Sequence, residues 1–247
     1  MEVASGIRRL GSGMINVYLL EEAGEVTIVD TGAPGYYSRD LPAELEAMGR
    51  KLEDVRAVVL THAHSDHLGF AERIRRERHV PVLIHEADAE LARGEVKPLR
   101  DPDAPGLRAI RPLPLLSFFA LAVRLGAMRT PPVLEVATFG DGASLDVPGV
   151  PRVVLAPGHT AGSAALTVVS RDVIFVGDAF ATRNVMSGST GPQLAPFGAD
   201  LRQAYDSLER LDGIDVQVVL PGHGLPWNGG LASALASVRE RGRPRGR

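Results

Sequence analysis

The 247-residue sequence predicts an α/β fold with a mixed β-sheet. Short apolar, β-branched runs bounded by Gly, Pro or Asp alternate with stretches of helical apolar spacing, a pattern typical of strands and helices in one domain. The first two runs are joined only by EEAGE (21–25), which favours antiparallel pairing, whereas helical stretches separate later runs. The expected strands are residues 15–20, 26–30, 57–60, 81–85, 152–156, 164–170, 172–178 and 216–220.

Helices are expected between these strands. The segment SRDLPAELEAMG (38–49) begins with Ser and Asp, keeps a helical apolar spacing and ends at Gly, which are helix start and stop signals. The same features predict helices over residues 68–78, 86–94 and 200–213.

Residues 95–138 break this alternation. Prolines flank an apolar stretch at helical spacing (113–128), which is either a further core helix or an apolar lid or partner-binding helix. We expect a single domain over residues 1–238 with this insertion at about 95–138. A basic, flexible tail is expected at 239–247, because arginines alternate there with Gly, Pro and Glu.

Composition excludes several classes of function. The chain has no cysteine, so disulfides, thiolate metal sites and a cysteine nucleophile are excluded, and any metal must be held by nitrogen and oxygen. A formal net charge of −3 gives no electrostatic reason to expect nucleic acid or an anionic membrane as the main partner. The apolar runs are too short to span a membrane, and the N-terminal residues lack a secretory signal pattern, so a cytoplasmic protein is expected.

The segment THAHSDHLGF (61–70) contains three of the seven histidines of the chain. Residues two apart in an extended segment point the same way, so His62 and His64 share one side at the end of the expected strand 57–60. Asp66 and His67 enter a helix that we expect to begin at about Leu68. Imidazole and carboxylate are the ligands that Zn²⁺ and related ions prefer when thiolate is absent, so this cluster predicts a metal site.

Further strands end in the same kind of residue. Apolar runs lead into short Gly-containing loops that carry His159, Asp178 and His223, and VTIVDTGAP places Asp30 in the same way. Glycine lets the chain turn sharply, so these side chains face the rim of the sheet, where α/β folds carry their functional residues.

The ordered set resembles the complete dinuclear motif of the metallo-β-lactamase superfamily. The resemblance implies an αββα sandwich of two mixed β-sheets flanked by helices, with the metals at one edge. It also implies that Asp178 bridges two ions and that Asp30 supports the ligands from behind, although a turn-capping role for Asp30 stays open. The implied ligands are His62, His64 and His159 for one ion, and Asp66, His67 and His223 for the other.

Two divalent cations would share one water, lower its pKa and hold the hydroxide against an electrophilic carbon or phosphorus, with Asp66 or Asp178 handling the proton. We therefore expect a metal-dependent hydrolase that contains two ions, zinc first, with iron, manganese or cobalt as alternatives. The expected substrate is a small molecule with an apolar part and an ester-like bond, namely a lactone, thioester or carboxylic ester. Where acyl-homoserine lactone lactonases have a substrate-polarising tyrosine, this chain has Ala181, which argues against that particular substrate.

Other functions stay open at this point. A single-iron oxygenase of the persulfide dioxygenase type would use only His62, His159 and Asp178. β-Lactamase or phosphodiesterase activity would use the full ligand set, and a non-catalytic metal-binding protein would use the apolar insertion on a partner. The same insertion could be buried in a homodimer.

Overall fold

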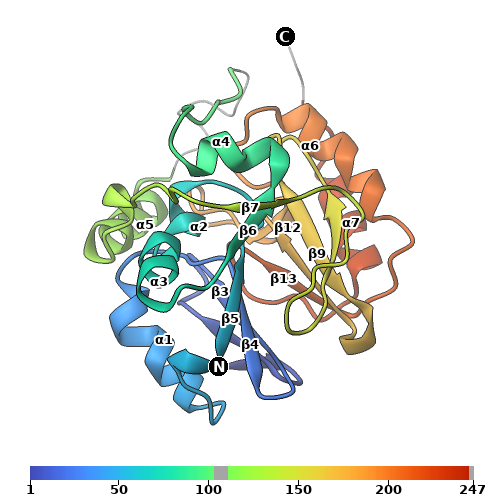
Figure 1. The fold of residues 1–247 in the computed structure, drawn as a ribbon. Helices are drawn as coiled ribbons and strands as arrows, with labels where there is room; N and C mark the ends of the chain where they lie inside the picture. The colour runs from blue at the N-terminus through green and yellow to red at the C-terminus, as the bar shows by residue number, and fades with distance from the viewer. Residues whose placement is uncertain (103–110, 245–247) are drawn as a thin grey trace.

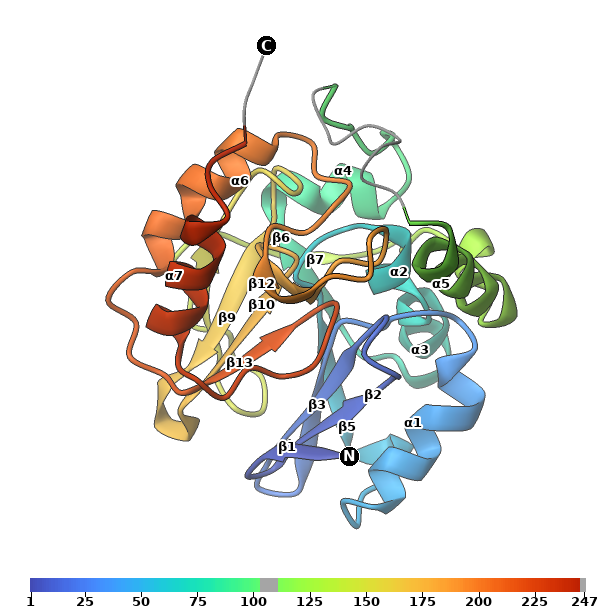
Figure 2. The same cartoon turned by 180° about the vertical axis from the view of Figure 1, so that it is seen from behind.

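Two β-sheets face each other, and helices cover the outer face of each sheet (Figure 1; Figure 2). This arrangement is that of a computed structural model, which describes residues 1–102 and 111–244. Helices α1 (Tyr36–Glu46), α3 (Ala71–Arg78) and α5 (Pro112–Arg124) lie on the side of the larger sheet, whereas α6 (Leu201–Ser207) and α7 (Leu231–Glu240) lie on the side of the smaller one. The predicted sandwich of helix, sheet, sheet and helix is confirmed.

The larger sheet is mixed. Its first four strands pair antiparallel, and its later strands pair parallel. The register sets Ile28 opposite Val58, and Val59 opposite Leu83. Within the described ranges its order is β1 (Glu2–Ala4), β2 (Ile7–Leu10), β3 (Val17–Glu22), β4 (Glu25–Val29), β5 (Val55–Val59), β6 (Val82–His85) and β7 (Ala137–Phe139).

The smaller sheet is mixed as well, which confirms the prediction for both sheets. Its order is β13 (Val218–Pro221), β10 (Val173–Gly177), β9 (Ala164–Val168) and β8 (Arg152–Leu155). The β13–β10 pair is parallel and the other pairs are antiparallel. A separate hairpin of β11 (Ala181–Arg183) and β12 (Thr190–Gln193) follows β10.

The hydrophobic core is layered because successive strand residues point to opposite faces. Val58 joins the cluster that includes residues of α1 and α3, whereas Val59 joins the cluster between the two sheets. Phe175 of β10 belongs to the same inner cluster, and its neighbour Ile174 packs with Leu235 of α7 on the outer side. These layers fix the two sheets against each other and so fix the loops at their edges.

The prediction of one helix over residues 68–78 is wrong in two respects: the helical region begins earlier, and it is divided into two helices. A short helix, α2 (Ser65–Leu68), already contains Asp66 and His67, and the chain breaks at Gly69 before α3 begins. A Cβ on Gly69 would overlap the carbonyl oxygens of Thr31 and Gly32, which lie in the loop after β4. A residue larger than glycine therefore does not fit at position 69.

The insertion contains α5, and its residues 103–110 lie outside the described residues. Ala122 and Leu125 are buried in the core, but Leu113 and Leu116 are 77% and 63% exposed. Features of a core helix and of an exposed apolar helix are thus both present in α5.

The predicted tail begins inside α7. Arg239 and Arg243 form ion pairs with Asp212 and Asp206, and residues 245–247 of this tail lie outside the described residues. In the part of the chain that the structure describes, none of the helices has the length and hydropathy needed to cross a membrane.

Candidate metal centre

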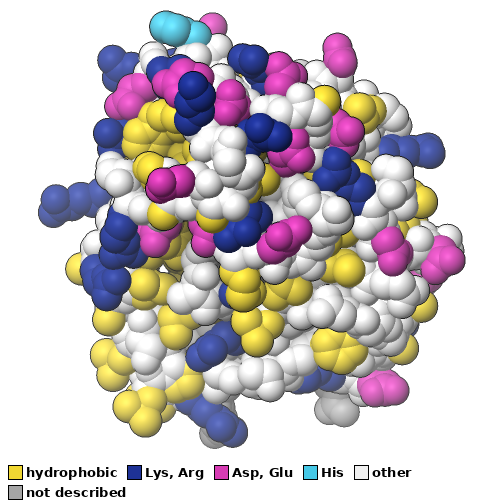
Figure 3. All heavy atoms as spheres, turned by 90° about the horizontal axis from the view of Figure 1, so that it is seen from below, with side chains coloured by type: hydrophobic (Ala, Val, Ile, Leu, Met, Phe, Trp, Pro, Cys, Tyr) yellow, Lys and Arg dark blue, Asp and Glu magenta, His cyan; other side chains and the backbone are white. Residues whose placement is uncertain are grey.

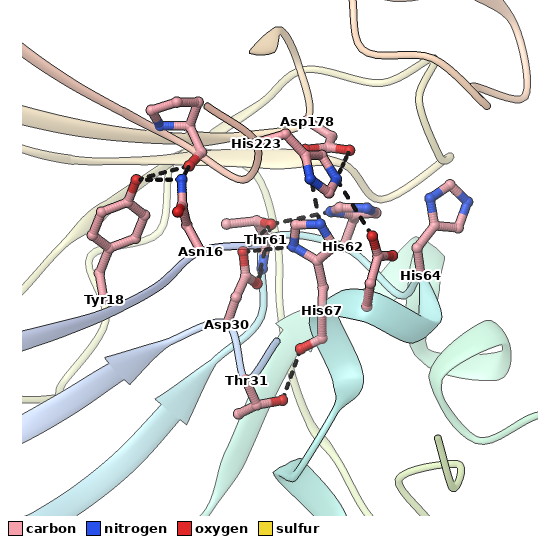
Figure 4. A network of polar contacts seen from close by, with 12 residues as sticks. Asn16, Tyr18, Asp30, Thr31, Thr61, His62, His64, His67, Asp178 and His223 are labelled. Carbon is pink, nitrogen blue, oxygen red and sulfur yellow. Dashed lines mark hydrogen bonds and ion pairs between the residues drawn. The ribbon is translucent and has the colours of Figure 1, made fainter. Parts of the chain in front are cut away.

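The loops at one edge of the sandwich bring the seven predicted ligands together. Figure 4 labels five of them: His62, His64, His67, Asp178 and His223. β5 leads through Thr61 to His62 and His64, and α2 then presents Asp66 and His67. The smaller sheet supplies the other ligands from the loops that follow β8, β10 and β13, which carry His159, Asp178 and His223. The candidate ligands thus come from both sheets.

In the described part of the chain, three groups of side chains offer ligand atoms that lie within 4.8 Å of one another. The first group is His62, His64 and His159, and the second is Asp66, His67 and His223. The third is His62, His67 and Asp178, and it overlaps the other two. Asp178 lies between the first two groups, since its Oδ2 is 3.3 Å from Nε2 of His159 and 3.3 Å from Nε2 of His223. The resemblance assigns one ion to each of the first two groups and a bridging role to Asp178.

Several buried atoms of this cluster fit a metal ion. His62 Nε2, His67 Nε2 and Asp178 Oδ1 are buried without a hydrogen-bond partner among the described residues. Buried polar atoms are otherwise hydrogen-bonded in native proteins, so such atoms need an explanation. Nitrogen and carboxylate oxygen atoms arranged in this way are suitable ligands for a divalent ion, and the donor set therefore fits the predicted cofactor.

Asp30 supports the histidine motif from behind. Its Oδ2 lies 2.9 Å from Nδ1 of His67, and its Oδ1 accepts a hydrogen bond of 2.8 Å from the Thr61 backbone N–H. Asp30 takes a left-handed conformation, with φ of 57°, to reach these partners. The carboxylate fixes the ring of His67 so that Nε2 faces Asp178, which favours the supporting role over a turn-capping one.

The loop of His223 is held by residues that the sequence did not single out. Asn16 Nδ2 donates to the carbonyl oxygens of Pro221 (2.9 Å) and Gly224 (2.8 Å), and the Tyr18 hydroxyl donates to Pro221 (2.7 Å; Figure 4). His223 Nδ1 contacts the carbonyl oxygen of Met14, which leaves Nε2 to face the cluster.

Asp88 is a further residue that sequence reasoning missed. It ends the short helix η2 (Glu86–Asp88) and is buried. Its Oδ2 accepts hydrogen bonds from the Ala63 backbone (2.9 Å) and the Thr160 hydroxyl (2.7 Å), and its Oδ1 accepts one from the Gly162 backbone (2.7 Å). Asp88 thus joins the loop of His62 and His64 to the loop of His159. Because these loops are far apart in the sequence, no local sequence pattern predicts the contact.

Burial and charge separate the protonation states of the histidines. Burial and the neighbouring histidines hold the pKa of His62 well below its usual range, and burial lowers the pKa of His159 to about 3 despite the nearby Asp178. At His67 and His223 burial acts in the same direction, but carboxylates outweigh it. Asp30 leads in raising the pKa of His67 to about 9, and Asp178 leads in raising the pKa of His223 to about 10.

The acids of the site are held ionised. Burial favours the neutral form of Asp66 and Asp178, but the surrounding histidines outweigh it. His67 and His223 lower the pKa of Asp66, and His223 and His159 hold the pKa of Asp178 well below its usual range. Ionised carboxylates and neutral imidazoles are the forms that bind cations. At neutral pH, His67 and His223 are therefore the ligands from which a metal ion would displace a proton, because their pKa values are raised.

Comparison with known proteins agrees with this geometry. A profile of the metallo-beta-lactamase superfamily matches residues 10–223. The chain belongs to this superfamily. It is 27% identical over 260 residues to the "Probable metallo-hydrolase YflN" of Bacillus subtilis (strain 168), with 96% of this chain and 94% of that protein covered.

Solved structures of the superfamily share the fold. The metallo-beta-lactamase family protein TTHA1429 from Thermus thermophilus aligns with a TM-score of 0.68 at 24% identity, over 96% of this chain and 79% of that one. TTHA1623 in a di-iron-bound form aligns with a TM-score of 0.60 at 26% identity, over 96% and 98% of the two chains. The fold that the resemblance implies is thus confirmed by comparison as well.

Proposed function

We propose that this member of the superfamily is a dinuclear metal-dependent hydrolase that cleaves an ester-like bond, namely a lactone, thioester or carboxylic ester, in a small molecule with an apolar part. The observation that carries the proposal is the pair of ligand groups with Asp178 between them. Two such groups would hold two ions, which together would activate a water and polarise the bond to be cleaved.

The residues of the two groups have distinct roles. His62, His64 and His159 would hold one ion, and Asp66, His67 and His223 the other, with Asp178 bridging. Two bound ions would supply a hydroxide from a shared water and polarise the carbonyl of the substrate. Asp66 is 19% exposed at its side chain, so its carboxylate is placed to take a proton and to pass it to the leaving group.

The number and kind of ions are part of the proposal. TTHA1623, with 26% identity to this chain, has been solved in a di-iron-bound form, which supports a site for two ions. Nitrogen and oxygen ligation suits zinc, iron, manganese and cobalt, and zinc remains our first expectation. A single-iron oxygenase would leave Asp66, His67 and His223 without a common task, so this alternative is less well supported.

The test combines metal analysis with a substrate panel. We expect about two ions per chain and turnover of one ester-like class in a panel of lactones, thioesters, carboxylic esters, β-lactams and phosphodiesters. About one iron per chain with oxygen uptake and no hydrolysis would instead indicate the oxygenase. Hydrolysis of only the β-lactam or the phosphodiester would keep the hydrolase but change its substrate class.

The variant Asp66→Ala tests the second ion. It should retain one ion and lose about 100-fold or more in kcat/KM, because one ligand group is incomplete. The exposed Asp215→Ala serves as the matched control and should behave as the wild type. Hydrolysis by Asp66→Ala at the wild-type rate would contradict the dinuclear proposal.

A further inference from the structure

An apolar cavity opens beside the candidate metal centre. Its volume is about 580 Å³, and His64 and Asp66 lie in its wall. Apart from a few polar side chains, the rest of the wall is apolar and includes Leu91 of α4 (Ala89–Ala92) and Phe118 and Ala122 of α5. A mostly apolar cavity of this size, with a few polar side chains that include His64 and Asp66, is typical of a site for a small molecule with an apolar part.

Helix α5 is the outer wall of this cavity and lies beside α2, which carries Asp66 (Figure 1; Figure 2). The ring of Phe118 is 6.2 Å from the ring of His223, so the apolar wall reaches the candidate ligands. Backbone hydrogen bonds hold both ends of the helix, from Arg111 N–H to Met186 (3.0 Å) and from Gly35 N–H to Leu125 (2.8 Å). The wall is thus a fixed part of the fold.

Small buried residues leave the cavity open. Ala92, Ala122 and Ala127 line it and are each at most 5% exposed. Larger side chains at these positions would fill the space. By contrast, Phe119 and Met128 line the cavity and remain 43% and 63% exposed, so a ligand chain would cover apolar surface that now faces water. On the face seen in Figure 3, hydrophobic side chains gather at the lower left, the side on which α5 lies.

We propose that this cavity binds the apolar acyl chain of the substrate, with the scissile carbonyl beside His64 and Asp66. The proposal rests on the proposed hydrolase function. The acyl chain is bonded directly to the carbonyl carbon and stays attached to it when the leaving group departs. An apolar wall that adjoins the candidate ligands His64 and Asp66 is therefore placed to hold this chain. Each added methylene should raise kcat/KM about fourfold until the cavity is full.

The experiment measures kcat/KM of the metal-loaded protein on p-nitrophenyl esters with acyl chains of increasing length, from acetate to myristate. The wild type should gain with length and then level off. Ala122→Leu narrows the cavity, so its kcat/KM should stop rising with chain length and should fall far more on the long esters than on the acetate. Ala120→Leu, the same change on an exposed position of α5, should match the wild type.

A second variant keeps the test decisive if Ala122→Leu does not fold. Leu91→Ala widens the cavity and should move the preferred chain to greater length. Flat activity along the acyl series, or a length dependence that both cavity variants leave unchanged, would overturn the proposal. A length dependence found only for acetates of long alcohols would also overturn it, because the chain would then lie on the leaving-group side.

Binding of 1-decanol, measured by calorimetry on the same metal-loaded proteins, separates the two proposals. If no ester is hydrolysed but 1-decanol binds the wild type and binds Ala122→Leu at least tenfold more weakly, the cavity is supported and the hydrolase function fails. If esters are hydrolysed without length dependence and 1-decanol does not bind, the hydrolase function stands and the acyl site fails.

Discussion

The carboxylate of Asp88 connects two loops that carry three candidate ligands. Its hydrogen bonds reach Ala63, which stands between His62 and His64, and Thr160, which follows His159. Asp88 is buried, so the groups that donate hydrogen bonds to it have no contact with water. Its carboxylate is the acceptor that takes the place of water for these donors. Asp88 therefore acts through the positions of His62, His64 and His159 and not through the substrate.

Asp88→Ala should weaken the first ion site. The buried N–H groups of Ala63 and Gly162 would lose their acceptor, so we expect a loss of about 3 kcal/mol in the free energy of unfolding and a fall of about 10- to 100-fold in metal affinity. Urea unfolding and a Co²⁺ titration followed by absorption measure the two effects. Asp88→Asn keeps one carbonyl acceptor and should recover part of the affinity. Unchanged Co²⁺ affinity in Asp88→Ala would refute the positioning role.

The histidine pKa values predict how the stability of the metal-free protein depends on pH. In the folded protein the pKa of His159 is about 3, so this histidine stays neutral in mildly acidic solution. In the unfolded chain the same histidine takes up a proton below its usual pKa of about 6.5. The free energy of unfolding therefore falls as the pH falls below about 6.5. The raised pKa values of His67 (about 9) and His223 (about 10) stabilise the fold below pH 6.5, and this contribution is lost as pH rises through them.

With respect to these groups, the protein in EDTA should be most stable near pH 6.5. Urea unfolding at pH 5, 6.5 and 9 measures this. A steady gain in stability from pH 6.5 to 9 would be inconsistent with protonated His67 and His223. Bound metal should make the free energy of unfolding less dependent on pH both above and below pH 6.5. The metal-bound ligands then no longer gain or lose protons over this range.

At the scale of elements, the turn after β13 must pass close to the ligands. A Cβ on Gly222 would lie 2.5 Å from Asp178 Oδ1 and 2.5 Å from His67 Cε1, so a larger residue would displace the bridging carboxylate. Gly222→Ala should lower kcat/KM by about 100-fold, the effect of a misplacement of about 1 Å. Gly140→Ala, where a Cβ meets nothing within 4 Å, is the matched control. If metal content and kcat/KM of Gly222→Ala equal those of Gly140→Ala, this packing argument fails.

Elements differ in how far the sequence predicts them. Most of the buried strands and the mixed pairing follow from apolar runs, but β2 reads IRRL and forms because its residues pair in register with β3. Helix α7 was not predicted, although Leu231, Ala234, Leu235 and Val238 keep a helical spacing on its buried face. Short side chains and the absence of a side-chain cap make that signal weak.

The candidate ligands were predictable because they follow strand ends within a few residues. Asp88, in contrast, has its partners 25, 72 and 74 residues away along the chain, and such contacts depend on how the loops meet in the fold. Only the tertiary structure reveals them. The cavity has the same origin, since its wall comes from α2, α4, α5, the segments next to them and the distant Phe197.

At the scale of the whole molecule, the candidate centre joins the two sheets. His62 and His64 follow β5 of the larger sheet, and Asp66 and His67 lie in α2, whereas His159, Asp178 and His223 follow strands of the smaller sheet. A cation held by both sets would cross-link the sandwich at one edge. Because the unfolded chain has no preformed site, the free energy of metal binding adds to the stability of the fold.

Removal of the metal should therefore lower the melting temperature of the whole domain. Metal at 100 to 1,000 times its Kd stabilises the folded state by about 3–4 kcal/mol, which for a domain of this length corresponds to about 10 °C in Tm. Circular dichroism melts of the loaded and the EDTA-treated protein measure the difference. In Asp66→Ala, which keeps one ligand group intact, part of the shift should remain, whereas Asp215→Ala should keep it all. Equal Tm values for loaded and EDTA-treated wild type would mean that the two sheets hold the ligands in place without help from the ion.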